Sequence, residues 1–385
     1  MNTIILKLEK HISNAIEHET RLGLLDGLSG YLLFYNTLCK TYSNEDYKNK
    51  LVKVIEKINL ILEQQHVSFS LCSGLAGYGL ALLQIKNNFI EIDEEYLDSI
   101  DYILFDKLDA ESEKNNYDFM HGSMGIAMYF VERWKKNKSI LISNKLNLFA
   151  EVLILNIEKN KKDFFIKENG FVSEKHIHFG IAHGVSGYIN FLTYLQTNFI
   201  DLQSNITNSI EICIDVLKSY EKYNEISNQF YPHSTLLESD TINPAIFGWC
   251  QGDLGVSNAF YNASVFLRDE NLKKESTKLI SNSKNITITN SRINDFGICH
   301  GSTGIIAQYK LNSIKQDIDC KQEINKWFDI VQKQTDNFEV FMAHQGHNEY
   351  ISETNLLSGS IGLAMTLLTI ENKIDLSWLK CLNLY

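Results

Sequence analysis

A short motif, Gly-x-x-Gly followed by an apolar run, occurs seven times along this chain of 385 residues. The copies begin at Gly27, Gly74, Gly122, Gly184, Gly252, Gly301 and Gly359. Successive copies are 47 to 68 residues apart, which leaves room for two helices and their loops in each interval. A motif repeated on this scale is typical of architectures in which each unit buries its apolar face against its neighbours. The motif therefore predicts a helical repeat fold.

Two kinds of helix are expected in each interval. The runs that follow the glycines are apolar nearly all round, which is typical of helices buried on every side. Intervening segments such as Glu45–Glu63 place Lys and Glu between apolar residues at three- and four-residue spacing, so they should be half-exposed. Wholly apolar inner helices favour a closed ring, because an open superhelix would leave one of their faces in water. The predicted fold class is all-α, an α/α toroid of seven inner and seven outer helices.

Composition narrows the class of protein. Only two prolines occur, which suits long helices, and 44% of the residues are hydrophobic. The net charge of −11 argues against a nucleic-acid partner. No unbroken apolar run reaches the roughly 20 residues that span a bilayer, and residues 1–20 lack the apolar core of a signal peptide. We therefore expect a cytoplasmic protein whose seven cysteines are reduced thiols or metal ligands.

The chain has no low-complexity segment and no clear linker, so residues 1–385 are predicted to form one domain. The two longest intervals leave room for loop or hairpin insertions around 160–180 and 220–245. Asp163–His178 alternates aromatic and charged residues around an Asn-Gly pair at 169–170, which predicts a small hairpin over the mouth of the ring.

Two of the glycine motifs are preceded by metal-ligand residues. Cys250 and Cys299 each lie two residues before the first glycine of their motif, and His300 follows Cys299 directly. Adjacent residues diverge on a helix or strand, so Cys299 and His300 could face one metal only from an irregular loop. The glycines supply such a loop, and Ser302 is expected to cap the next helix. The pattern predicts a zinc site shared by two neighbouring loops, with buried packing or a structural zinc as alternatives.

Three motifs together resemble the lanthionine synthetase C-like family, the cyclases of lanthipeptide biosynthesis and their relatives. They are Trp-Cys-Gln-Gly at 249–252, Cys-His-Gly at 299–301 and Ala-His-Gly at 182–184, and the resemblance covers nearly the whole chain. It implies an α/α toroid with a zinc ion held by Cys250, Cys299 and His300. It further implies that His183 is the catalytic histidine and that Asp118 is its acidic partner.

The family's chemistry would suit these residues. The resemblance implies Michael-type addition of a peptide cysteine to dehydroalanine or dehydrobutyrine, which gives a (methyl)lanthionine thioether ring. Three protein ligands leave the fourth position of a tetrahedral zinc open, and coordination there would lower the pKa of a thiol. His183 would protonate the α carbon, with Asp118 orienting its ring. Separately, each could be a structural residue, a histidine near a helix start and a helix-entry cap.

One departure from the family pattern concerns substrate preference. Well-studied cyclases have Arg four residues before the first cysteine and Tyr just after it, where this chain has Ile246 and Gln251. An alternative function is therefore a related enzyme that adds glutathione or another thiol to dehydroamino acids in proteins. A further alternative is a non-catalytic, zinc-containing toroid that binds a peptide. A carbohydrate-active α/α barrel ranks last, since it would need a carboxylate pair at the mouth.

The resemblance also implies partners. The expected substrate is a dehydrated precursor peptide of antibiotic biosynthesis. Because the chain holds only the toroid, dehydration is expected from a separate dehydratase and export from a transporter. The protein could then lie at the periphery of a membrane-associated biosynthetic complex, without a transmembrane segment of its own.

Overall fold

The structure is a computed structural model that describes residues 3–86, 89–169, 172–238, 241–346 and 349–385. Its contacts divide the chain into two compact units. Unit 1 comprises Met1–Ile142, Asp295–Ile298 and Phe328–Cys381, and unit 2 comprises Ser143–Asn294, Cys299–Trp327 and Leu382–Tyr385. The organisation of 1–385 as one domain stays a prediction.

A helix begins directly after the first glycine of each of the seven motifs, as predicted. These glycine-capped helices are α2 (Leu28–Tyr42), α4 (Leu75–Ile85), α6 (Ser123–Asn137), α8 (Val185–Asn198), α10 (Asp253–Leu267), α13 (Ser302–Lys315) and α15 (Ser360–Ile370). They are the most deeply buried helices, and in α15 every residue from Ser360 to Thr369 is buried. Their apolar sequences are therefore explained by burial on all sides.

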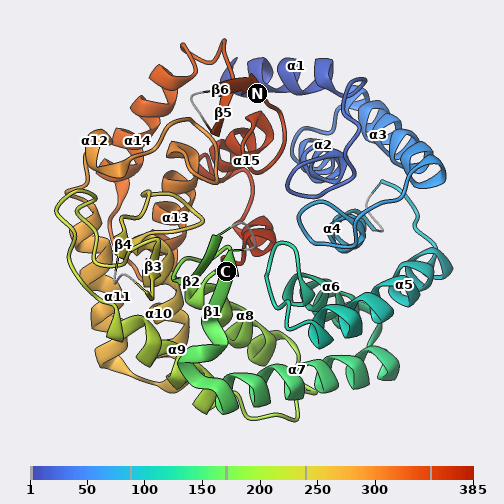
Figure 1. Ribbon diagram of the computed structural model, residues 1–385. Helices are drawn as coiled ribbons and strands as arrows, with labels where there is room; N and C mark the ends of the chain where they lie inside the picture. The colour runs from blue at the N-terminus through green and yellow to red at the C-terminus, as the bar shows by residue number, and fades with distance from the viewer. Residues whose placement is uncertain (1–2, 87–88, 170–171, 239–240, 347–348) are drawn as a thin grey trace. The chain divides into compact units, whose positions relative to one another are not determined.

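Seven longer intervening helices also match the prediction. They are α1 (Thr3–Ala15), α3 (Glu45–Gln64), α5 (Glu94–Glu113), α7 (Ile140–Asn160), α9 (Thr207–Ser219), α11 (Glu270–Ser283) and α14 (Lys321–Gln334). The described residues also include one single-turn helix, α12 (Ile288–Ser291). In unit 1, α3 and α5 lie in a second layer behind α2, α4 and α6 (Figure 1). In unit 2, α9 packs on α8 and α11 on α10. Each pair buries one face of the intervening helix.

Short strands occupy the long intervals. In unit 2 an antiparallel sheet has the order β1-β2-β3-β4, from β1 (Ile166–Asn169), β2 (Val172–His178), β3 (Ser234–Leu236) and β4 (Thr241–Asn243). The predicted Asn-Gly turn includes Gly170, which lies outside the described residues. In unit 1 an unpredicted hairpin joins β5 (Met342–Gly346) to β6 (Glu349–Ser352). Strand β2 carries His176 and His178, and a third histidine, His233, lies directly before β3.

One helical stretch among the described residues is long and apolar enough to be compared with a membrane-spanning helix. Ile140–Phe165 has a mean hydropathy of 1.5 and is long and apolar enough, by composition alone, to cross a membrane. Its side chains Leu146, Phe149, Leu153 and Ile157 are buried in the protein. A core helix passes the same test, so this stretch is weak evidence for a membrane span.

Most of the motif glycines are needed because the preceding loop passes very close to them, and not because their backbone dihedral angles are unusual. Gly74 has an extended backbone with φ of −144°. A Cβ atom there would lie 2.0 Å from the carbonyl oxygen of Ser68, and one at Gly77 would lie 2.1 Å from that of Leu71. Gly252 is the exception among the helix caps, with φ of +96°. The preceding loop therefore folds tightly over the first turn of each helix, in a space that only glycine leaves open.

Main-chain carbonyls take the place of side-chain caps. Gly301 is the N-cap of α13 and Ser302 is its first helical residue, so the prediction that Ser302 is the cap is wrong. The loop before the helix supplies main-chain acceptors for α2, α4, α6, α8 and α15: the Leu75 N–H, for example, donates to the Ser68 carbonyl at 2.9 Å. At α10 the Asp253 N–H donates to the side-chain oxygen of Gln229 at 3.0 Å instead. These bonds satisfy N–H groups that a helix leaves unpaired at its start. A capping hydroxyl was expected from residue type alone, before the course of the loop was known.

Neighbouring turns are joined to one another by main-chain hydrogen bonds. In unit 1, Leu25 N–H donates to the Cys72 carbonyl and Cys72 N–H donates to the Met120 carbonyl, both at 3.0 Å. The Ile298 N–H donates to the Leu357 carbonyl, and the Leu357 N–H donates to the Leu25 carbonyl, both at 2.9 Å. The turns before four helices of unit 1, α2, α4, α6 and α15, are thus joined by backbone contacts.

The close approach predicts the effect of adding one methyl group. Gly77→Ala would place its Cβ within 2.1 Å of the Leu71 carbonyl oxygen and 2.7 Å of the Leu24 Cβ. We expect the free energy of unfolding to fall by about 3 kcal/mol, despite the better helix propensity of alanine.

The control for this variant is Gly346→Ala, which has open space around it and only a φ of +93° to oppose it. It should cost about 1 kcal/mol. Chemical denaturation of both variants measures the difference, and equal losses would contradict the steric explanation.

Candidate metal centre

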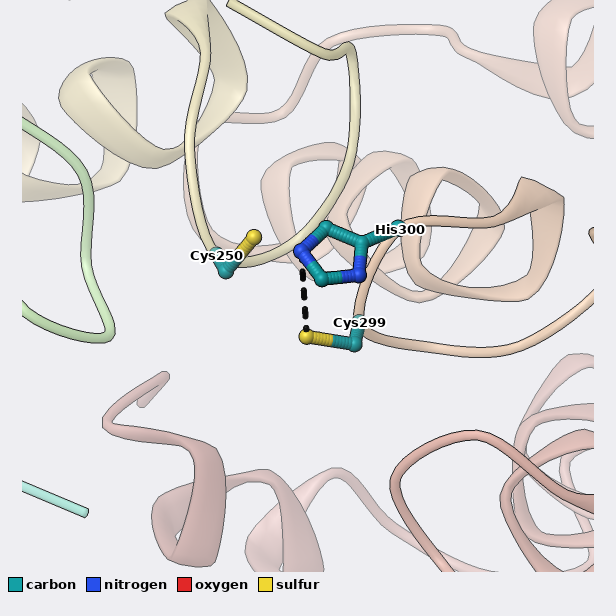
Figure 2. A group of neighbouring side chains, drawn as sticks. All are labelled: Cys250, Cys299 and His300. Atoms are coloured by element: carbon teal, nitrogen blue, oxygen red, sulfur yellow. Dashed lines mark hydrogen bonds between the residues drawn. The ribbon is translucent and has the colours of Figure 1, made fainter. Parts of the chain in front are cut away.

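Cys250, Cys299 and His300 meet in unit 2. Their ligand atoms all lie within 4.8 Å of one another, and Cys299 Sγ lies 3.7 Å from His300 Nε2. Figure 2 shows the Cys250 side chain on one loop, directed toward Cys299 and His300 on the next loop. The structure therefore brings together the three residues that the sequence nominated for a metal.

Backbone contacts hold these two loops together. The N–H groups of Trp249 and Cys250 both donate to the Cys299 carbonyl, at 3.1 and 3.4 Å. A Cβ atom at Gly248 would lie 2.7 Å from the same carbonyl oxygen, so a larger residue would push the loops apart. The proximity of the two cysteines therefore follows from main-chain contacts between the loops.

A third loop packs against Cys250 and carries His183. The Ala182 N–H donates to the Cys250 carbonyl at 3.4 Å, and a Cβ atom at Gly180 would lie 2.0 Å from that oxygen. His183 follows directly and is exposed at the turn before α8. The candidate catalytic histidine thus belongs to the loop beside the metal-ligand loops.

The electrostatic environment favours thiolate at Cys250. A hydrogen bond with Cys299 holds the pKa of the Cys250 thiol well below its usual value, with help from His300 and against the opposing effect of burial. Two cysteines and one histidine on adjoining loops are a donor set that zinc accepts. Cys250 and Cys299 are half-buried and His300 is exposed, so the centre opens to solvent. These residues fit a zinc ion.

Gln251 supports Cys250 at one of the positions that depart from the family pattern. Its side chain is 5% exposed. Its Nε2 donates to Cys250 Sγ at 3.8 Å, and its Oε1 accepts a hydrogen bond from the Ile246 N–H at 3.1 Å. The two unusual residues, Gln251 and Ile246, are therefore in direct contact. Sequence analysis had singled out both positions without finding this contact.

A cluster of three histidines lies near the centre and was missed by sequence analysis. The His178 ring centroid is 4.6 Å from that of His176 and 4.8 Å from that of His233. His176 and His178 lie two apart on β2, and the pairing of His178 with Ser234 brings His233 alongside. Their alternate spacing on a predicted strand could have indicated a shared face, but nothing local in the sequence points to His233.

The neutral form is favoured at two of these histidines, His178 and His233. Burial, together with repulsion from His233, His176 and His183, lowers the pKa of His178 to about 3. Burial also lowers the pKa of His233, where Cys250 acts in the opposite direction. The charges of Cys250 and His183 therefore reach this cluster, in which His178 and His233 are polar side chains that favour the neutral form.

Asp118 lies in unit 1, whereas His183 lies in unit 2. One Asp118 carboxylate oxygen accepts hydrogen bonds from the N–H groups of Met120 and His121, at 2.9 and 2.8 Å. Asp118 therefore stabilises the turn before Gly122, in keeping with the alternative of a helix-entry role. Its action on His183 stays a prediction.

Comparisons with known proteins give the chain its family and fold. The family model described as Lanthionine synthetase C-like protein matches residues 4–383. The solved structure "Nisin cyclase" is similar with a TM-score of 0.75 and 22% identity, covering 100% of this chain and 98% of that chain. An inactive variant of an alpha-1,6-mannanase of Salegentibacter sp. is similar only at a TM-score of 0.42 and 9% identity, over 96% of this chain and 97% of that chain. No curated protein sequence matches.

The structural match confirms the predicted fold class, an α/α toroid. At 22% identity it carries the fold alone. The family model extends over all seven glycine motifs and all three candidate ligands. The chain therefore belongs to the lanthionine synthetase C-like family.

Proposed function

We propose that this protein is a zinc-dependent lanthipeptide cyclase, which joins cysteine thiols to dehydroamino acids within one peptide. The observation that carries the proposal is the convergence of Cys250, Cys299 and His300 within 4.8 Å in a chain of this family. The likeness to a nisin cyclase structure supports a peptide as the substrate. We expect that peptide to arrive already dehydrated by a separate enzyme, to be exported by a transporter, and to be cyclised in the cytoplasm.

Cys250, Cys299 and His300 would hold the zinc ion. When bound, the ion would supply the positive charge that lowers the pKa of an incoming substrate thiol. Gln251 would keep the Cys250 sulfur in place through its N–H donor. The neutral histidines His178 and His233 would add no positive charge that competes with the ion.

The reaction needs one proton moved and none consumed. The thiol loses its proton, its sulfur bonds to the β carbon, and the alkene electron pair shifts to form an enolate. Protonation of the α carbon completes the thioether. His183 is the proposed donor, because it is exposed on the loop that packs on Cys250 and an imidazole exchanges protons near neutral pH. Asp118 is proposed to orient its ring.

A second function is favoured by the residues that depart from the cyclase pattern. Gln251 and Ile246 bond to each other, so neither reproduces an arginine or tyrosine directed at substrate. Addition of an external thiol such as glutathione to dehydroamino acids in proteins would use the same centre. Incubation with glutathione and a dehydrated peptide without cysteine separates the two: a rate equal to that of ring formation would favour this second function.

Removal of one ligand tests the metal. Purified protein should contain close to one zinc per chain, and Cys299→Ala should lose most of it, because two donors bind far more weakly than three. Elemental analysis measures the content. Cys320→Ala, which removes a buried thiol of the same unit outside the cluster, should retain its zinc. Full occupancy in Cys299→Ala would refute the ligand assignment.

Loss of the proton donor should leave the metal in place. His183→Ala should keep its zinc and still bind dehydrated peptide, while turnover falls roughly 100-fold or more. In deuterated water the wild type should add one deuterium to each new α carbon with a single configuration. Mass spectrometry of the product reports both rate and labelling.

The matched control is His66→Ala, which removes an exposed histidine of unit 1. It should cyclise at the wild-type rate. Wild-type rate and stereochemistry in His183→Ala would remove that residue from the mechanism, and loss of zinc would place it among the ligands instead.

Gln251 should influence zinc affinity through Cys250. Gln251→Leu keeps the side chain's bulk but loses the donor at 3.8 Å from the sulfur. We expect zinc affinity to fall about 10-fold, the lower end of the range for a residue that orients a ligand. Competition with a chelator measures it, with the exposed Gln203→Leu as control. Unchanged affinity in Gln251→Leu would show that the contact has no role in metal binding.

A further inference from the structure

Unit 1 contains a pocket at the ends of its helices that lie away from the glycine turns. It has a volume of about 340 Å³ and an apolar floor that includes Leu33, Met365 and Trp378. A second cavity of about 270 Å³ shares Lys40, Gln84 and Ser377 with it. The two cavities therefore adjoin, close to the C-terminal ends of α2 and α4 and to the segment after α15. We call them the lysine pocket.

The lysine pocket concentrates positive charge in a chain whose net charge is −11. The lysines that line it are Lys40, Lys86, Lys136, Lys373 and Lys380. Only two acidic residues line it with them, Glu132 and Asp375. The local excess of three positive charges is opposite in sign to the charge of the protein as a whole.

Two of the five lysines are neutralised and three are not. Lys380 forms an ion pair with Glu132, and Lys86 forms one with Glu94. Across the described part of the chain, Lys40, Lys136 and Lys373 form no ion pair with a carboxylate and donate no side-chain hydrogen bond. These three ammonium groups are the ones available to a ligand.

Lysines near helix C-termini often offset the negative end of the helix dipole, and Lys40 and Lys136 lie in the last turns of α2 and α6. That role is strongest when the ammonium group bonds the terminal carbonyls, which neither lysine does in the described residues. Burial lowers the pKa of Lys40, and Lys136 adds to the effect while Asp375 opposes it. The pocket therefore places its ammonium groups where an anion would relieve unfavourable charge.

We propose that the lysine pocket binds a small phosphorylated ligand with at least two negative charges. Its volume is within the range of small-molecule sites. Lysine ammonium groups bind phosphate oxygens as point charges, and several of them together suit a compact group that carries more than one negative charge. Ser377 and Thr41 provide hydroxyl groups, and Trp378 provides an apolar surface for the remainder of the ligand. This site belongs to unit 1 and is separate from the candidate metal centre in unit 2.

Inorganic pyrophosphate is the probe. Isothermal titration calorimetry on the full chain at low salt should show saturable binding with one site per chain. Lys40→Gln combined with Lys136→Gln should weaken binding at least about tenfold, because two of the three unpaired charges are lost. Lys373→Gln alone provides a milder variant with a several-fold loss, in case the double variant does not fold. Lys10→Gln, at an exposed lysine of α1, changes the net charge by the same amount as Lys373→Gln and should leave binding unchanged.

Citrate tests whether phosphate chemistry is recognised. It should bind at least about tenfold more weakly than pyrophosphate at equal ionic strength, because its charge is spread over three separate carboxylates whereas that of pyrophosphate is concentrated on two adjoining phosphates. Binding of citrate as tight as that of pyrophosphate would overturn the phosphate assignment. No binding of pyrophosphate at millimolar concentration, or an equal loss in Lys10→Gln, would overturn the site itself. Zinc content is unaffected by either outcome, so this test is independent of the proposed cyclase activity.

Discussion

The main-chain hydrogen bond from one glycine turn to the next is the contact on which the other features depend. In the turns before α2, α4, α6 and α8, a Cβ atom on either motif glycine would lie within 2.7 Å of a carbonyl oxygen. The turn then has backbone groups left over, and it shares them with its neighbour, as Cys72 does with Leu25 and Met120. Helix starts are thereby fixed relative to one another within each unit before any functional side chain is considered.

The candidate metal centre is a direct product of that linkage. Trp249 and Cys250 bond to the Cys299 carbonyl, so the thiols of two repeats meet because their backbones are joined. Gln251 then fixes one sulfur from the side. A site assembled in this way needs little reorganisation to receive an ion, since two of its loops are already in contact. What the ion would add is charge, because the chain's own contribution there is thiolate and neutral imidazole.

Much of this arrangement could be predicted, and the failures have physical reasons. The glycine motifs predicted the buried helices correctly, because an apolar run must be covered by the rest of the protein. The Cys-His pair predicted the cluster because neighbouring repeats lie side by side. Ser302 was assigned a capping role from its residue type, whereas Ser302 is the first residue of α13 and Gly301 is its N-cap. His233 was missed because its partner His178 is brought close by strand pairing across an interval of 55 residues. The lysine pocket could not be predicted, because its lysines come from the ends of α2, α4 and α6 and from the segment after α15, which lie far apart in the sequence.

The main-chain bonds between turns do not involve the side chains that lie between the two glycines of a motif. The two residues between the glycines of each motif differ in every copy here, from Leu-Ser and Leu-Ala to Val-Ser and Asp-Leu. The residues just before the motifs also vary. Cys72, two residues before Gly74, is buried, whereas His183, directly before Gly184, is exposed. A substitution beside a turn can therefore change the local chemistry while the main-chain bonds that hold the helix starts remain. Each turn can acquire a new side-chain function separately from the others.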